Sequence, residues 1–369
     1  MSHHRGLNSA KYSRLRGAPS EQGSVGRQLA DFVEAVADTY AGNDEVRHGA
    51  PHARNIHMEF SMCILYMADP ADAEKWRDSL STFTPELEFR QWPDIGNPAE
   101  VHYILAWEPL TNLAEQFSNL RIIYAAGAGV DQFDLASLPG HVSLIRLVDS
   151  SMADIMAEYV LFGVIALHRD ILAYQEDQRS GSWHPRPIVR ASQRRVGVMG
   201  VGNLGRAALD RLQPLGFQLS GWNRSLKDVP GGSCYVGRDQ LDEFLGQCDI
   251  LVNMLPLTPD TDGILNAARL ACLPRGAGLI NVGRGAHVIE RDLLEALDEG
   301  RLGGAVLDVL VQEPPSQGSP VWKHPRILLT PHVASDVQIS GAVAVIVENL
   351  AREKARKPLV NVVDRSKGY

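Results

Sequence analysis

The stretch Arg195-Val196-Gly197-Val198-Met199-Gly200-Val201-Gly202-Asn203-Leu204-Gly205-Arg206 decides the fold of this chain. It predicts a short buried strand, a glycine turn and the first turn of a helix. The G-x-G-x-x-G spacing suits a pyrophosphate lying on the helix N-terminus. Gly200 permits the tight turn, Gly202 leaves room for the phosphates, and Gly205 lets helix and strand pack closely. Three spaced glycines also fit an ordinary turn, so the assignment depends on the residues around them.

Length and composition set the broad class of the protein. The chain has 369 residues, of which 44% are hydrophobic and 22% charged. This length predicts two domains, and this composition is that of an ordinary globular protein. The net charge of -8 offers no basic surface for a nucleic-acid backbone, so a nucleic-acid partner is not expected.

Cysteine usage and hydropathy point to the cytoplasm. The four cysteines are far apart and contain no C-x-x-C motif: Cys63, Cys234, Cys248 and Cys272. Neither a disulfide framework nor a metal site is indicated, and free thiols fit a reducing compartment. No apolar run reaches the length of a membrane span, so we expect no membrane partner.

Residues 58–150 carry one α/β pattern. Apolar runs predict strands at 60–66, 87–91, 103–107, 122–125 and 143–147, with helices near 71–83 and 110–117. Residues 1–57 lack such a pattern, and we expect them to form a disordered N-terminal extension.

A long apolar helix follows. It is predicted to start with Ser151 as its cap and to run to about Tyr174. Its apolar residues lie on nearly all sides, which predicts a buried connector. The following loop contains prolines and Trp183, a tryptophan that would suit a subunit interface.

The second α/β series contains the glycine turn. Strands are predicted at 196–199, 217–222, 250–254, 278–281, 304–308 and 327–329, with helices near 204–215, 240–245, 266–273 and 290–298. Strands alternating with helices predict a parallel, doubly wound sheet. A last helix near 339–356 is expected to return to the first domain, which makes that domain discontinuous.

The end of the second strand of this series bears on the cofactor. An NAD site needs an acidic residue there for the ribose 2′-hydroxyl. The chain has Asn223 instead, followed by Arg224, Ser225 and Lys227. Cations and a hydroxyl attract a 2′-phosphate, so NADP(H) is favoured and NAD(H) remains possible. The alternative is a solvated turn with basic residues.

Six ordered motifs resemble the D-2-hydroxyacid dehydrogenase family, in particular its glyoxylate/hydroxypyruvate reductase A branch. The resemblance covers about Met58 to Tyr369, and the motifs are the glycine turn, 126–131 (AGAGVD), 255–261 (LPLTPDT), 281–285 (NVGRG), 307–309 (LDV) with 313–314 (EP), and 330–334 (TPHVA). It implies an α/β fold with two doubly wound domains flanking a cleft. A flavodoxin-like substrate domain (58–150 and 334–369) would join a Rossmann NADP-binding domain (151–333), with hinges near Ser151 and Ala334.

The resemblance gives catalytic roles to Arg284, Glu313 and His332. An arginine can grip the carboxylate of a 2-oxo acid and polarise its ketone. A protonated histidine can supply the proton as hydride arrives, and a glutamate beside it would favour the imidazolium. His102, His141, His287 and His324 lack such a context and are expected at the surface.

Further binding roles are implied by the same resemblance. The substrate would be bound by Arg284 and His332, by backbone N–H groups of Gly127, Ala128 and Gly129, and by Trp107. The expected cofactor-binding residues are Gly200, Gly202, Asn203, Leu204, Gly205, Asn223, Arg224, Ser225, Lys227, Leu255, Pro256, Thr261, Val282, Arg284 and Asp308. No metal is expected. Three positions depart from the family pattern, namely Glu108, Gly283 and Leu310; a looser turn before Arg284 is the expected result of Gly283.

The sequence therefore predicts a homodimeric, NADPH-preferring reductase of small 2-oxo acids, converting glyoxylate to glycolate and hydroxypyruvate to D-glycerate. One alternative is another D-2-hydroxyacid dehydrogenase with a larger substrate or with NADH. Another is a dinucleotide-sensing protein that resembles the corepressors of the family.

Overall fold

A computed structural model describes residues 62–107, 113–127, 129–148, 150–366 and 368. They fall into two compact units. One combines the chain before Ser150 with the chain from Val337 onward, and the other is Ser150–Asp336. The predicted extension at 1–57, and the predictions made for Glu108 and Ala128, lie outside the described residues.

The first unit is built on a five-stranded parallel sheet in the order β2-β1-β3-β4-β5. This is the flavodoxin-like order that the resemblance implies. The strands are β1 (Cys63–Met67), β2 (Glu88–Gln91), β3 (Val101–Ala106), β4 (Ile122–Ala125) and β5 (Ser143–Arg146).

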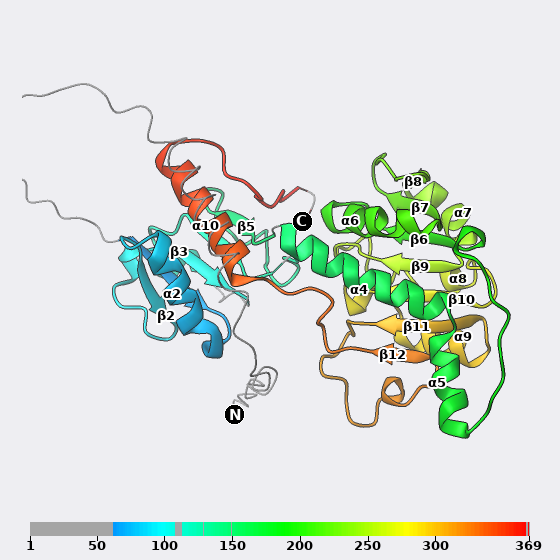
Figure 1. Ribbon diagram of the computed structural model, residues 1–369. Helices are drawn as coiled ribbons and strands as arrows, with labels where there is room; N and C mark the ends of the chain where they lie inside the picture. The colour runs from blue at the N-terminus through cyan, green and yellow to red at the C-terminus, as the bar shows by residue number, and fades with distance from the viewer. Residues whose placement is uncertain (1–61, 108–112, 128, 149, 367, 369) are drawn as a thin grey trace, which may run out of the picture. The chain divides into compact units, whose positions relative to one another are not determined.

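Alternate residues of these strands pack under helices on the two faces of the sheet. Helices α2 (Ala73–Phe83) and α10 (Ile339–Lys354) lie over one face, where Tyr66, Tyr103 and Tyr124 are buried (Figure 1). The short helix α3 (Leu113–Gln116) contributes to the core on the other face. Helix α10 thus brings the end of the chain back to the first unit.

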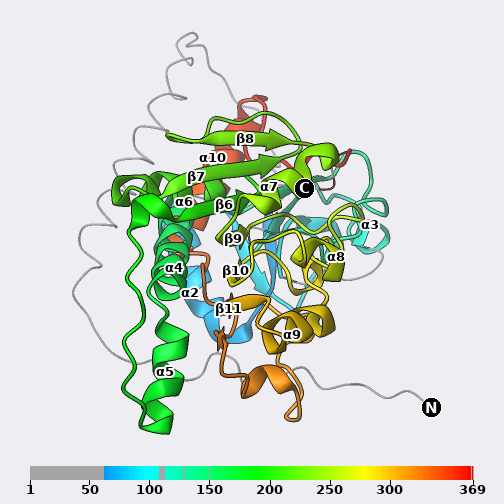
Figure 2. The same ribbon diagram turned by 90° about the vertical axis from the view of Figure 1, so that its right-hand side faces the viewer.

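The second unit holds a seven-stranded parallel sheet in the order β12-β11-β10-β9-β6-β7-β8. Its strands are β6 (Arg195–Met199), β7 (Gln218–Asn223), β8 (Ser233–Val236), β9 (Ile250–Asn253), β10 (Ala277–Asn281), β11 (Leu302–Leu307) and β12 (Ile327–Leu329). Strand β8 extends the sheet beyond β7 (Figure 2) and was not predicted. Strand order reverses between β6 and β9, and ligands of such sheets bind beside that point.

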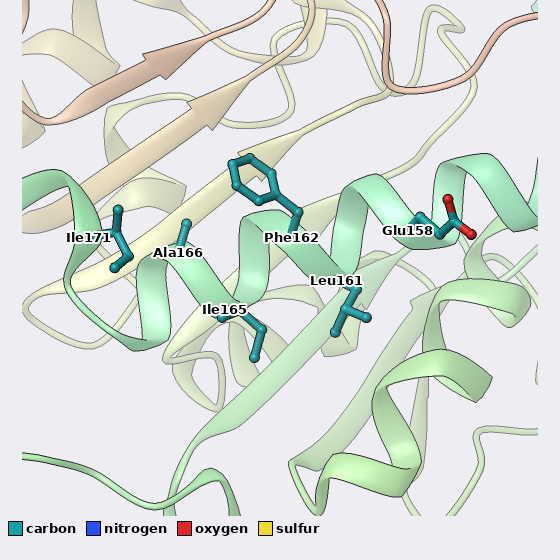
Figure 3. Close-up of a pocket in the computed structure, with 6 residues that line it drawn as sticks. All are labelled: Glu158, Leu161, Phe162, Ile165, Ala166 and Ile171. Atoms are coloured by element: carbon teal, nitrogen blue, oxygen red, sulfur yellow. The ribbon is translucent and has the colours of Figure 1, made fainter. Parts of the chain in front are cut away.

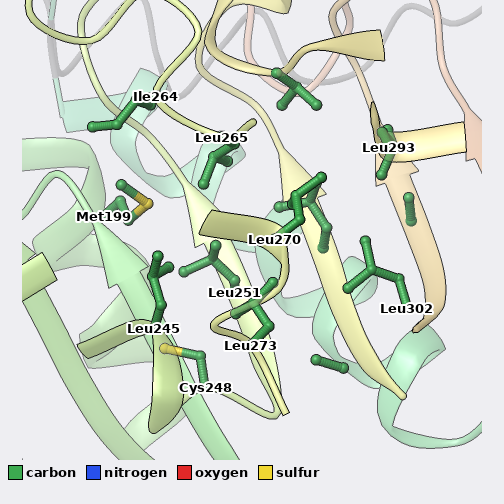
Figure 4. Packing of buried hydrophobic residues seen from close by; sticks show 14 of the residues in the cluster. Met199, Leu245, Cys248, Leu251, Ile264, Leu265, Leu270, Leu273, Leu293 and Leu302 are labelled. Carbon is green, nitrogen blue, oxygen red and sulfur yellow. The ribbon is translucent and has the colours of Figure 1, made fainter. Parts of the chain in front are cut away.

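Two hydrophobic layers hold this sheet between helices. Helices α4 (Ser150–His168) and α6 (Asn203–Leu212) cover one face. Helices α7 (Leu241–Gly246), α8 (Ala267–Leu270) and α9 (Glu290–Asp298) cover the other, where Leu245, Cys248, Leu251 and Leu270 pack together (Figure 4). Within β9, Leu251 faces this second layer and its neighbours Ile250 and Val252 face the first, as strand alternation requires.

The predicted long helix is in fact two helices. Helix α4 begins at Ser150, so Ser151 lies in its first turn and is not its cap. It ends at His168, because Asp170 adopts a left-handed conformation (φ 55°) that interrupts the helix. Helix α5 (Ile171–Ser180) then continues to Gly181, another left-handed residue.

Helix α4 is long and apolar enough, by length and composition alone, to cross a membrane. It packs against α6, β9, β10 and β11, which is the position of a core helix and gives no indication of a membrane protein. One apolar stripe of α4 nevertheless faces outward within its unit. This stripe consists of Leu161, Phe162 and Ile165 and continues to Ile171 of α5, and the buried Ala166 lines the same hollow (Figure 3).

Candidate functional site

The glycine turn lies between β6 and α6, beside the point where strand order reverses. Gly200 has φ 93°, and a Cβ there would lie 2.7 Å from the carbonyl oxygen of Met254 after β9. A Cβ at Gly205 would lie 2.0 Å from the carbonyl oxygen of Gly200. Both glycines are therefore required by close backbone packing, as the motif predicts.

The turn has the features of a phosphate cradle. A Cβ at Gly202 would meet nothing within 4 Å, so this position opens onto free space. Asn203 and Leu204 begin α6, whose N-terminus has no side-chain capping bond. Uncapped N–H groups and the positive end of the helix dipole favour an anion here. The residues present fit a dinucleotide pyrophosphate.

The loop after β7 carries exposed cations. Asn223 is the last residue of β7, and its side chain donates to the carbonyl oxygen of Ser225 at 3.0 Å. Arg224, Ser225 and Lys227 are exposed. No acidic side chain stands at the position where an NAD site has one. This loop suits a 2′-phosphate better than a 2′-hydroxyl.

His332 and Glu313 form a close pair beyond the ends of β11 and β12. The His332 ring Nδ1 lies 2.9 Å from Glu313 Oε2, and the two side chains are 28% and 25% exposed. The other carboxylate oxygen, Oε1, accepts from the backbone N–H of Leu310 at 3.0 Å. The glutamate therefore fixes the ring while leaving it partly open to solvent.

Asp308 holds the segment that carries His332. His332 has φ 58°, a strained conformation for a residue other than glycine. The Asp308 carboxylate accepts from Thr330 Oγ1 (2.6 Å) and from the N–H groups of Val333 (2.8 Å) and Ala334 (2.9 Å). Its contact with the nicotinamide stays a prediction, and sequence reasoning missed this positioning role.

Tyr159 connects α4 to the same segment. Its hydroxyl lies 2.5 Å from Thr330 Oγ1, and burial raises the pKa of Tyr159 to about 12. The hydroxyl therefore keeps its proton at neutral pH. Sequence reasoning gave Tyr159 only a place on a buried helix.

The Arg284 turn lies against the loop that carries Glu313. A Cβ at Gly285 would come within 2.0 Å of the Leu310 carbonyl carbon and 2.3 Å of the Val311 nitrogen. Only a glycine at position 285 lets the Arg284 turn contact the backbone at Leu310 and Val311. The N–H of the same Leu310 donates to Glu313. The fold of the second unit brings these two loops together, although Arg284 and Glu313 are distant in the sequence.

His287 is not a surface residue, contrary to the sequence prediction. It is fully buried, and its ring lies among Asn253, the Arg284 backbone and the carbonyl oxygen of Pro256. His324 is also largely covered and pairs with Asp298 at 3.2 Å, whereas His141 is exposed and His102 half-buried. Nothing in the sequence indicated that His287 is buried, because its partners come from the segments at the ends of β9 and β10.

The turn before Arg284 is also tighter than predicted. A Cβ at Gly283 would lie 3.0 Å from His287 Nδ1 and from the carbonyl oxygen of Leu255, and 3.1 Å from Asn253 Nδ2. Gly283, which departs from the family pattern, therefore lies in a closely packed turn and not in a loose one. Leu310, the other departure in this unit, is half-buried against the α7–α9 side of the core.

Further predicted cofactor-binding residues follow β9 and β10. Thr261 Oγ1 donates to the Pro256 carbonyl oxygen at 2.7 Å and accepts from the Thr258 N–H at 2.9 Å, which closes the loop after Leu255. Val282 is buried, and its N–H donates to the carbonyl oxygen of Asn253. These residues lie at the same edge of the sheet as the glycine turn.

In the first unit, Trp107 packs on Gly127. Trp107 follows β3, Gly127 follows β4, and a Cβ at Gly127 would lie 2.7 Å from indole Cζ3. Gln132 Nε2 donates to the Trp107 carbonyl oxygen at 3.0 Å. Gly129 is half-buried on the same turn, and the packing places Gly127, one of the predicted substrate-binding glycines, beside the indole.

Among the described residues, no group of three or more His, Cys, Asp or Glu side chains could hold a metal ion. The four cysteines, all of them described, are free; Cys63 and Cys248 are buried, while Cys234 and Cys272 are only partly covered.

Comparison with known proteins places these features in a family. Residues 161–334 match the model of the D-isomer specific 2-hydroxyacid dehydrogenase NAD-binding domain. A D-isomer specific 2-hydroxyacid dehydrogenase from Xanthobacter autotrophicus Py2, solved with NADPH and MES, is 41% identical with a TM-score of 0.80. The match covers 84% of this chain and 100% of that one.

Two further solved structures have a TM-score of 0.77. An NADPH-dependent glyoxylate/hydroxypyruvate reductase from Sinorhizobium meliloti, in complex with NADP and sulfate, is 34% identical, over 84% of this chain and 100% of that one. A probable 2-hydroxyacid dehydrogenase from Rhizobium etli CFN 42, in complex with NADP, HEPES and L(+)-tartaric acid, is 32% identical, over 84% and 99%.

Proposed function

The chain belongs to the D-isomer specific 2-hydroxyacid dehydrogenase family and is an NAD(P)-dependent enzyme, and from that premise we propose that it reduces small 2-oxo acids with NADPH. The proposed reactions are glyoxylate to glycolate and hydroxypyruvate to D-glycerate. The observation that carries the proposal is the 2.9 Å His332–Glu313 pair on a loop packed against the Arg284 turn.

Arg284 is the residue that we assign to the substrate carboxylate and ketone. Its guanidinium can donate to both groups at once, because its N–H bonds form a planar fork. When bound, the reduced nicotinamide supplies the hydride. Negative charge then grows on the ketone oxygen, and a fixed cation beside it lowers the energy of the transition state.

His332 is the residue that we assign as the proton donor. Its Nδ1 is paired with Glu313, so Nε2 is the ring atom that would give its proton to the ketone oxygen. The Glu313 carboxylate holds the ring in place for the transfer. Positioned acid catalysis of this kind contributes about 100- to 10,000-fold to the rate.

The preference for NADPH rests on the loop after β7. Arg224 and Lys227 are exposed there, and Asn223 replaces the acidic residue that an NAD site uses. The Xanthobacter and Sinorhizobium structures contain NADPH and NADP, which supports the same choice.

The preference for small substrates rests on Trp107. Its indole covers Gly127, and we assign substrate-carboxylate binding to the backbone N–H groups of Gly127, Ala128 and Gly129. A large, rigid side chain beside that turn leaves little room for a bulky substituent. The glyoxylate/hydroxypyruvate reductase among the similar structures supports this substrate class.

We further propose a cytoplasmic homodimer. The outward apolar stripe of α4 and the arm after α5 are the surfaces that we assign to the dimer contact. Trp183 on that arm is 95% exposed, and Phe162 on the stripe is 50% exposed. Exposed aromatic side chains of this kind are typical of subunit interfaces.

A kinetic panel tests the function. Glyoxylate, hydroxypyruvate, pyruvate and phenylpyruvate are each assayed with NADPH and with NADH, following loss of the reduced cofactor. The expected result is the highest kcat/KM for glyoxylate or hydroxypyruvate with NADPH. A higher kcat/KM for phenylpyruvate, or for NADH, would reject the corresponding part of the proposal.

A further inference from the structure

Three polar side chains are buried where β9 and β10 end. Asn253 and Asn281 are the last residues of these neighbouring strands, and His287 ends the short 3₁₀ turn after Arg284. All three are almost wholly inaccessible to solvent. Buried polar groups are costly unless they are hydrogen-bonded, so their bonds show what the cluster holds in place.

The cluster fixes the backbone of Arg284 from both sides. The Arg284 N–H donates to His287 Nδ1 at 3.0 Å, and Asn281 Nδ2 donates to the Arg284 carbonyl oxygen at 3.0 Å. Asn281 Oδ1 in turn accepts from Asn253 Nδ2 at 2.9 Å. The main chain that carries the guanidinium is therefore held by a network that extends back to β9.

The same cluster fixes the loop after β9. His287 Nε2 lies 3.2 Å from the Pro256 carbonyl oxygen, and Asn253 Oδ1 accepts from the Leu255 N–H at 3.4 Å. Leu255 and Pro256 are residues that the proposed function assigns to the cofactor. One histidine ring thus spans the Arg284 turn and the cofactor loop.

The bonds also determine which nitrogen of His287 carries the proton. Nδ1 faces two donors, the Arg284 N–H and Asn253 Nδ2, each at 3.0 Å. Nδ1 must therefore accept, so Nε2 carries the proton and donates to Pro256. A neutral ring in this tautomer satisfies both loops.

We propose that His287, held by Asn253 and Asn281, is a positioning residue that sets Arg284 through Nδ1 and the Leu255–Pro256 cofactor loop through Nε2. This inference rests on the proposed roles of Arg284 and of that loop. Hydrogen bonds to the residues that carry catalytic groups fix the geometry of those groups, and small misplacements reduce rates strongly. The close packing around Gly283 shows that the turn has little freedom to adjust.

Two substitutions separate the two arms of the ring. The amide oxygen of His287→Asn can replace Nδ1 as acceptor but cannot reach Pro256, whereas the amide N–H of His287→Gln can replace Nε2. We expect His287→Asn to raise the Kd for NADPH about tenfold with kcat within about threefold of wild type. We expect His287→Gln to lower kcat about tenfold or more with the Kd within about threefold.

The controls are the same two substitutions at His141, which is exposed in the first unit and should change neither quantity. Kd is measured by NADPH fluorescence and kcat at saturating substrate. Equal changes of kcat and Kd in both His287 variants, or no change in either, would overturn the inference, because a merely structural role would not separate them.

Asn281→Asp keeps the test decisive if the His287 variants do not fold. The carboxylate keeps the shape of the side chain but cannot donate to the Arg284 carbonyl oxygen, so kcat should fall about tenfold while the Kd for NADPH is kept. An unchanged kcat would overturn the inference.

Failure of the proposed function gives a different result. In that case the wild-type protein does not turn over any acid of the panel with NADPH, or its turnover is the same as that of the Arg284→Ala variant. The NADPH Kd of the two His287 variants still reports on the Pro256 arm.

Discussion

At the scale of single residues, the proposed chemistry depends on groups held by their neighbours. His332 sits in a left-handed conformation that three bonds to the Asp308 carboxylate stabilise, and its ring is oriented by Glu313. The resemblance of the sequence motifs to those of the family implied His332 and Glu313 as partners. The restraint by Asp308 came only from the folded loop.

Replacing the proposed acid tests its role directly. His332→Gln should lower kcat by about 100- to 10,000-fold because the side chain can no longer give up a proton. The Kd for NADPH should stay within about twofold, since the cradle around Gly202 is distant in the sheet order from this loop. His141→Gln is the control, and turnover within a few-fold of wild type for His332→Gln would assign the proton to another group.

Gly285 should tolerate no side chain. In Gly285→Ala the new methyl would overlap the Leu310 and Val311 backbone, which cannot move aside easily, so unfolding free energy should fall by about 1–3 kcal/mol or more. Thermal denaturation measures this. Gly202→Ala is the matched control, since its methyl meets open space; it should keep the Tm but weaken NADPH binding, because the methyl takes the space assigned to the pyrophosphate.

At the scale of elements, hydrophobic periodicity predicted the layers of both units well. Strands β4 and β12 and helix α9 have the predicted bounds, and most other elements differ by a residue or two. Strand β8 was missed because Ser233–Val236 is short, half-covered and lies at an edge, so it lacks the apolar run of a central strand. The break at Asp170 was missed because an aspartate can adopt the left-handed conformation, but its presence in a sequence does not predict that it will.

The loop after β7 should control the choice of cofactor. Asn223→Asp combined with Arg224→Ala places an acceptor at the ribose and removes a cation, so the ratio of kcat/KM for NADPH to that for NADH should fall by about tenfold or more. Arg238→Ala, an exposed arginine of the same unit, is the control. An unchanged ratio would place 2′-phosphate recognition on other residues.

The outward stripe of α4 should hold the proposed dimer together. Phe162→Glu puts a charge into an apolar contact and should shift the protein toward the monomer in sedimentation or light scattering. Asp239→Lys, at an exposed position away from the stripe, should leave the oligomeric state unchanged. A wild-type protein that is already monomeric would reject the dimer itself.

At the scale of the whole molecule, residues 1–57 should be dispensable. Deleting them should leave the NADPH-dependent kcat and the Tm within error of the full chain, because the predicted elements begin after them. A deletion that continues through Met67 is the contrasting case, since it removes β1, which pairs with both β2 and β3. Loss of activity or solubility in the shorter deletion would give the extension a structural role.

The sequence alone determined the two α/β series and the glycine turn, because periodicity and motif spacing are local properties of the chain. The family resemblance of its motifs pointed to Arg284, Glu313 and His332. Tertiary structure alone decided which polar groups meet. Asn253, Asn281 and His287 form one buried cluster only because parallel strands end at a common edge of the sheet. Hydrogen bonds between segments distant in the chain leave no periodic trace, so a histidine expected at the surface lies instead between the two loops that we assign to cofactor and substrate.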